Sequence, residues 1–175
     1  AHAIKNGMEL GPLTIRNATK NNCVEILTLL HNNGLLHQTQ LIYVAARWNS
    51  FEAMVYLNKI GHLFPRDIIE HACHGGGLDM IKFLIEKGYP LTEKCVTILA
   101  QNGHPKCLQY AHGKIPFPKR TLYRAIDGNC IDCIGFLLDT GENIEQQNLC
   151  CAYATDNNNL KCLIYLHEHG CVMNR

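Results

Sequence analysis

The chain has 175 residues, of which 47% are hydrophobic, and its formal net charge at pH 7 is only +1. A nearly neutral chain exerts no general electrostatic attraction on nucleic acid or on an anionic membrane surface, so we expect neither as a partner. No apolar run approaches the roughly 18 residues that a membrane-spanning helix needs. The hydrophobic fraction is large enough for a continuous core.

One short unit recurs along the chain. A small or apolar residue returns at intervals of 27, 27, 27, 26 and 29 residues, at Ala18, Ala45, Ala72, Leu99, Ala125 and Ala154. A glycine keeps the same spacing at Gly7, Gly34, Gly61, Gly88, Gly141 and Gly170, with Ile115 in place of glycine once. This self-similarity predicts a one-dimensional array of units, each of which contacts mainly its neighbours.

The unit is clearest at residues 45–61, AARWNSFEAMVYLNKIG. Ala45 is small, as a close helix–helix contact requires, and Trp48 lies in the turn that follows. From Phe51 the apolar residues recur with the i, i+3, i+4 spacing of a second helix. Gly61 stands where that helix would end in a left-handed residue. Each unit is therefore predicted to be a helix–turn–helix.

Six full units follow one another at residues 13–34, 41–61, 68–88, 95–115, 121–141 and 149–170, and residues 1–7 match the end of a preceding unit. We therefore expect a single array over residues 1–175, as an excerpt of a longer array. Asp67 and Thr92 are suited to cap the helices that follow them. The turn at residues 74–77, His-Gly-Gly-Gly, lacks the lysine and preceding strand of a phosphate loop, which favours a tight helix–helix turn.

The fourth unit is irregular. Ile115 replaces the glycine that ends the second helix in the other units, and Pro116 and Pro118 follow it. Because proline cannot continue a helix, we expect this helix to end near His112. The irregular segment predicts a weak or bent junction between the fourth and fifth units, which would expose Phe117.

Ten cysteines occur in the sequence, and three of them share one position in the repeat. Cys107, Cys133 and Cys162 each lie eight residues after the small residue, where other units carry Ile26, Ala53 and Met80. A position that accepts isoleucine, alanine, methionine and cysteine is a core position, where free cysteine behaves as a small hydrophobe. We therefore expect reduced thiols and an intracellular location, in the cytoplasm or nucleus of the producing or host cell.

The unit resembles an ankyrin repeat. The ankyrin pattern A-A-R-N-G-H-L-E-V-V-K-L-L-L-E-A-G maps without gaps onto residues 45–61. Ankyrin units usually run about 33 residues, whereas these run 27, and their T-P-L-H opening is replaced at residues 40–43 and 67–70. The resemblance implies an all-α solenoid whose β-hairpin fingers are reduced to loops. Residues 162–171, Cys-Leu-x-Tyr-Leu-His-Glu-x-Gly-Cys, further resemble short repeats abundant in giant DNA viruses of amoebae.

Residues with catalytic or metal-binding chemistry do not assemble into a recognisable motif. Cys130-x-x-Cys133 has metal or redox spacing, but it lacks a second such pair or a nearby histidine pair. His71 and His74 flank Cys73, yet side chains of adjacent helical residues diverge. We expect no enzyme activity, no metal and no cofactor.

Partner-binding candidates are the residues that vary while the repeat frame persists. Trp48 is the sharpest, because its equivalents are the asparagines and glycines that usually end a helix, and exposed tryptophan is enriched at binding hot spots. The sequence leaves open whether it instead packs back onto a neighbouring unit. The repeat position just before that of Trp48 carries polar residues, beginning with Lys20. Their charge changes from basic to acidic along the array, which suits either an extended partner of uneven charge or a solvated face. The full candidate set is Trp48, Arg47, His74, Gln101, Asp127, Asp156 and Phe117.

The resemblance implies binding through first-helix faces and inter-repeat loops. We therefore expect a non-catalytic scaffold that binds another protein of unknown identity. Two alternatives remain: the substrate-recognition part of a ubiquitin-ligase adaptor, and a structural component of a larger, viral assembly or of a longer chain.

Overall fold

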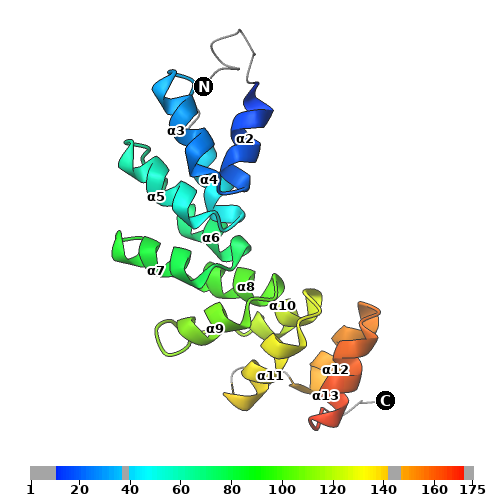
Figure 1. Cartoon of the computed structure of the whole chain (residues 1–175). Helices are drawn as coiled ribbons and strands as arrows, with labels where there is room; N and C mark the ends of the chain where they lie inside the picture. The colour runs from blue at the N-terminus through cyan, green and yellow to red at the C-terminus, as the bar shows by residue number, and fades with distance from the viewer. Residues whose placement is uncertain (1–10, 37–39, 142–146, 172–175) are drawn as a thin grey trace. The chain divides into compact units, whose positions relative to one another are not determined.

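The computed structural model describes residues 11–36, 40–141 and 147–171, and within these ranges it contains twelve helices and no strand (Figure 1). The predicted all-α fold is confirmed for this part of the chain. The unit end predicted at residues 1–7 lies outside the described residues. No helix in the described ranges has the length and apolar character needed to cross a membrane.

Each of the six predicted units holds two helices. The first helices are α2 (Pro12–Lys20), α4 (Leu41–Arg47), α6 (Ile68–Gly75), α8 (Glu93–Gln101), α10 (Thr121–Asp127) and α12 (Gln147–Asp156). The second helices are α3 (Val24–Asn32), α5 (Phe51–Lys59), α7 (Leu78–Glu86), α9 (Pro105–Ala111), α11 (Ile131–Asp139) and α13 (Leu160–Glu168).

The chain divides into two compact units, residues 1–89 and 90–175. In the first, α4 packs between α2 and α6, while α3 packs against α5. In the second, α10 packs between α8 and α12, and α11 between α9 and α13. First helices therefore contact first helices, and second helices contact second helices, as neighbours in a stack.

A left-handed residue closes every turn between the two helices of a pair. These residues have φ between 51° and 73° and are Asn22, Asn49, Gly76, Gly103, Asn129 and Asn158. Only glycine and asparagine adopt this conformation at low cost. In five of the six units the next amide then donates to the carbonyl of the small or apolar residue of the repeat, as Cys130 N–H does to the Ala125 carbonyl at 3.0 Å. In the third unit the Gly76 amide itself donates to the Ala72 carbonyl at 2.9 Å. The glycine-rich segment at residues 74–77 is such a turn, as predicted.

Glycine also ends the second helices. Gly34, Gly61, Gly88, Gly141 and Gly170 all have positive φ. After Gly34, Gly61, Gly88 and Gly170 the chain closes a wider hydrogen-bonded turn, such as the bond from Leu35 N–H to the Leu30 carbonyl at 2.9 Å. In the fourth unit Gly113, with φ 76°, takes the place of the missing glycine. Helix α9 ends at Ala111, next to His112, which confirms the predicted end.

The shared cysteine position lies in the core, as predicted. Cys107, Cys133 and Cys162 are buried, and all ten cysteines, which lie within the described ranges, are free thiols. Other inward-facing side chains of the second helices, such as Leu108 and Leu137, are buried as well.

The predictions for the connecting segments have mixed outcomes. Thr92 caps α8 by accepting a hydrogen bond from Cys95 N–H at 3.4 Å. Asp67 occupies the N-cap position of α6, but its side chain makes no capping bond.

The expected exposure of Phe117 is wrong, because this half-buried ring packs edge-on against His112 at 5.7 Å between centroids. His112 in turn contacts Phe136 of α11 at 5.5 Å, so aromatic rings fill the junction between the fourth and fifth units.

Candidate functional site

The polar row predicted from the repeat register occupies one structural position. Its members end the first helices: Lys20, Arg47, Gln101, Asp127 and Asp156 are last residues, and His74 is the residue before the last in α6. Trp48 follows at the C-cap of α4. The row thus marks the end of the first-helix face in each unit.

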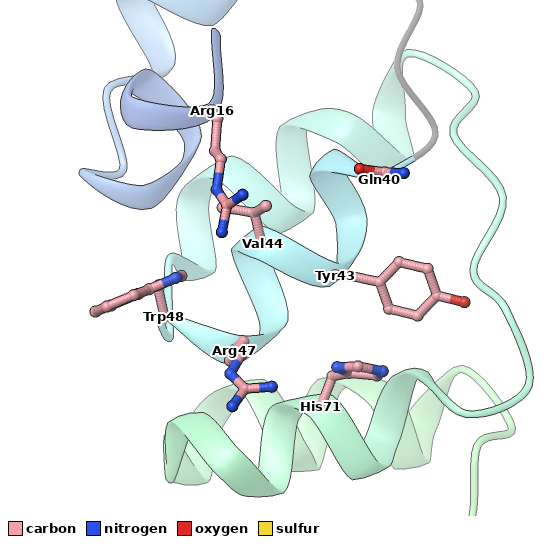
Figure 2. A pocket seen from close by; sticks show the side chains of 7 residues that line it. All are labelled: Arg16, Gln40, Tyr43, Val44, Arg47, Trp48 and His71. Carbon is pink, nitrogen blue, oxygen red and sulfur yellow. The ribbon is translucent and has the colours of Figure 1, made fainter. Parts of the chain in front are cut away.

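A surface hollow of about 350 Å³ lies on this face in the first compact unit. We call it the basic hollow, and it is lined by Arg16, Gln40, Tyr43, Val44, Arg47, Trp48 and His71. Figure 2 shows Arg16 reaching from α2 toward α4, with Tyr43, Arg47 and Trp48 projecting from α4 and His71 from α6. Two of the predicted candidates, Arg47 and Trp48, therefore lie in one site.

Trp48 is anchored on one side and open on the other. The Lys20 ammonium of the preceding helix pair lies 3.5 Å from the centroid of its ring, within cation–π range. Half of the residue surface, 50%, remains exposed. At the equivalent C-cap, Asn102 donates its side-chain amide to the Ile98 carbonyl at 2.8 Å. The Trp48 side chain is instead engaged through its ring face, by Lys20.

Positive charge dominates the basic hollow. The exposed Arg16 and Arg47 guanidinium groups form no ion pair with any residue that the structure describes, and no carboxylate lines the hollow. Asp67 contacts two residues of the lining: it accepts a hydrogen bond from the Tyr43 hydroxyl at 3.2 Å, and its other oxygen lies 3.7 Å from His71 Nε2. Burial and the hydrogen bond to Asp67 raise the pKa of Tyr43.

The second compact unit has a different hollow at the equivalent place. It has a volume of about 280 Å³ and is lined by Tyr123, Leu149, Ala152, Tyr153 and Asp156. The candidate Asp156 is exposed there. Asp127 is not open in the same way, because it accepts hydrogen bonds from Arg124 at 2.9 Å and from the Tyr153 hydroxyl at 2.6 Å. That bond to Asp127 raises the pKa of Tyr153.

The remaining candidates lie outside both hollows. His74 is half-buried, with its ring 6.5 Å from that of His71. Gln101 is exposed at the end of α8, and Phe117 packs against His112. Sequence reasoning missed Arg16 and Tyr43, which lie one helical turn before Lys20 and Arg47. The i, i+4 spacing from the polar row was the signal that could have found them.

The Cys-x-x-Cys pair has a structural role. Cys130 is the N-cap of α11, and its sulfur accepts a hydrogen bond from Cys133 N–H at 3.3 Å. Cys133 is buried, and burial raises the pKa of its thiol, with a further contribution from Cys130. Within the described ranges, no group of three or more histidine, cysteine or acidic residues is placed to hold a metal ion.

The fold and the two hollows define a class: an all-helical protein of stacked helix pairs whose first-helix faces carry the variable residues. No protein-family model matches the chain, and no curated protein matches it.

Proposed function

We propose that this chain is a non-catalytic protein-interaction module, an ankyrin-like helical solenoid that binds a partner protein through its first-helix faces and inter-repeat loops. The observation that carries the proposal is Trp48, a half-exposed tryptophan on a first-helix face that also presents two guanidinium groups. Tryptophan and arginine are the residues most enriched at binding hot spots.

The buried positions of the repeat stay nearly constant while the exposed positions vary, which supports this proposal. Ala45, Ala72 and their equivalents are buried, and the turn residues are confined to asparagine and glycine. The neighbouring positions at the ends of the first helices vary from lysine to tryptophan to aspartate without disturbing this frame. An inter-repeat loop also contributes apolar surface, because Leu63, between α5 and α6, is 90% exposed. The ten free thiols fit a reducing compartment, the cytoplasm or nucleus of the producing or host cell.

A displayed library of peptides, selected on the immobilised chain, tests the proposal. Sequences enriched on the wild-type chain should bind Trp48→Ala at least about tenfold more weakly, since truncating a hot-spot residue costs about 2 kcal/mol or more. Val55→Ala, which removes part of an exposed apolar side chain on the opposite helix layer, is the matched control and should bind normally. Failure to enrich any sequence, or enriched sequences that ignore Trp48→Ala, would contradict the proposal.

A further inference from the structure

Two hollows on the described part of the first compact unit differ in their charge. The hollow over the second helices is lined by Glu25, Glu52 and Lys59 together with polar and apolar residues, so its charges are mixed. The basic hollow contains two arginines and no carboxylate, and Lys20 lies over the Trp48 ring beside it. A positive potential that no described residue of the lining neutralises favours a negatively charged occupant on this face.

The groups in the basic hollow suit carboxylates on an extended chain. A guanidinium binds a planar carboxylate through two parallel hydrogen bonds. Arg16 and Arg47 come from neighbouring helices, α2 and α4, so they present two separate forks on one surface (Figure 2). Gln40 lies in the same lining and offers an amide that can donate to and accept from a peptide backbone. The exposed part of Trp48 adds apolar contact area at the edge.

The size and openness of the basic hollow favour a peptide over a small metabolite. Its volume of about 350 Å³ is at the lower end of ligand pockets, and it lies open on the surface rather than enclosed. Small ligands are bound by burying most of their surface, whereas a peptide gains affinity from successive contacts along a face. The overall charge of +1 provides no long-range attraction for a nucleic acid.

We propose that the basic hollow binds an acidic peptide segment of the partner, with aspartate or glutamate carboxylates bound by Arg16 and Arg47 and an adjacent residue packed on Trp48. This inference rests on the proposed function and specifies the chemistry of the partner at that face. The acidic segment belongs to the partner, and the hollow of the second compact unit with Asp156 plays no part in holding it.

The chain contains one tryptophan, so its fluorescence reports on this site directly. The probe is a short peptide in which every second residue is glutamate, titrated into the intact chain and compared with its glutamine isostere. We expect a saturable change in Trp48 emission with the glutamate peptide, binding at least about tenfold weaker for the isostere, and affinity that falls as salt is raised.

Matched variants separate the site from the overall charge. Arg16→Gln with Arg47→Gln should weaken binding of the glutamate peptide by at least about tenfold, and because both side chains are exposed the fold should be retained. Lys59→Gln with Lys106→Gln removes the same charge from exposed positions outside the hollow and should leave the affinity unchanged. Circular dichroism of each variant checks the helical content.

Other occupants give distinct results. Equal binding of the glutamine isostere, or unchanged binding by the double arginine variant, would overturn the proposal. Binding of a phosphoserine peptide or a single-stranded oligonucleotide more than about tenfold tighter than the glutamate peptide would also overturn it, by assigning the arginines to phosphate. If the displayed library yields Trp48-dependent peptides without acidic residues, the protein-interaction function stands and only the acidic assignment fails.

Discussion

At the scale of single residues, cysteine serves two different purposes in this chain. At the core position it acts as a small apolar side chain, as in Cys107 and Cys162, and its burial raises the thiol pKa. At the start of a second helix it acts as an acceptor, as Cys130 does for the amide of Cys133. The repeat register predicted the first purpose, whereas the second depends on which backbone amide faces the sulfur.

Core thiols should not react with alkylating reagents in the folded protein, and their replacement by a polar residue should lower the free energy of unfolding. We expect Cys133→Ala to lower the free energy of unfolding by about 1 kcal/mol, from the lost sulfur contacts. Cys133→Ser should cost about 1–3 kcal/mol, because it buries a hydroxyl. Urea denaturation measures both. Alkylation under native conditions followed by mass spectrometry should leave Cys107, Cys133 and Cys162 unlabelled, and rapid labelling of all three would contradict their burial.

The raised pKa values of buried thiols predict a loss of stability at alkaline pH. Burial raises the pKa of Cys107 from 9.0 to about 11 and that of Cys150 to about 12. Below pH 9 both folded and unfolded chains keep these protons, so the contribution is fully present. Between pH 9 and about 11 the unfolded chain loses protons that the folded chain retains, so the free energy of unfolding falls by up to about 1.4 kcal/mol per pH unit for each thiol.

Urea titrations across this range measure the slope. Cys107→Ala should make the decline shallower, because one raised pKa is removed. A free energy of unfolding that stays constant from pH 9 to about pH 11 would show that the thiols keep ordinary pKa values in the folded protein.

At the scale of helices and turns, much could be predicted from the sequence because each turn requires a particular residue. Positive φ restricts the turn positions to asparagine and glycine, and these residues recur in register, as Asn49 and Gly76 do. The basic hollow could be predicted only in part. Arg47 and Trp48 stand out as departures from the repeat, but the approach of Tyr43 to Asp67 depends on how adjacent units pack.

Two glycines set the distance between neighbouring first helices. A Cβ added at Gly128 would lie 2.1 Å from the Gln101 carbonyl oxygen, and one at Gly75 would lie 2.6 Å from the Ala46 carbonyl oxygen. Both obstacles are backbone atoms, so the helices must move apart. We therefore expect Gly128→Ala to lower the free energy of unfolding by about 1–3 kcal/mol, the usual cost of overpacking.

Asn157 provides the control, because it occupies the same register position in the sixth unit and is exposed. Asn157→Ala removes one hydrogen bond to the Tyr153 carbonyl and should cost no more than about 1 kcal/mol. Denaturation curves measure the free energy of unfolding of both variants. If it falls equally in Gly128→Ala and Asn157→Ala, the close approach of the helices at Gly128 has no special cost.

At the scale of the whole molecule, the sequence predicts a single array with a weak junction at residues 113–120. The structure divides into two compact units after Tyr89, and the fourth and fifth helix pairs lie together in the second unit. The weak junction stays a prediction. The irregular segment is packed rather than open, since Phe117 and Phe136 both contact the His112 ring. Proline spacing indicated where the helix ends, but it carried no information about the rings that fill the gap.

Because repeat arrays are stabilised mainly by contacts between neighbours, a local defect should propagate within a compact unit and stop at its boundary. We expect Gly75→Ala to speed hydrogen exchange in α2–α7 while α8–α13 keep their wild-type protection. Gly128→Ala should have the reverse effect, with α8 and α9 affected together with α10 and α11. Exchange followed by mass spectrometry of peptic fragments locates the change. A step in protection across residues 113–120, or faster exchange along the entire chain in both variants, would show that the boundary after Tyr89 does not separate two cooperative units.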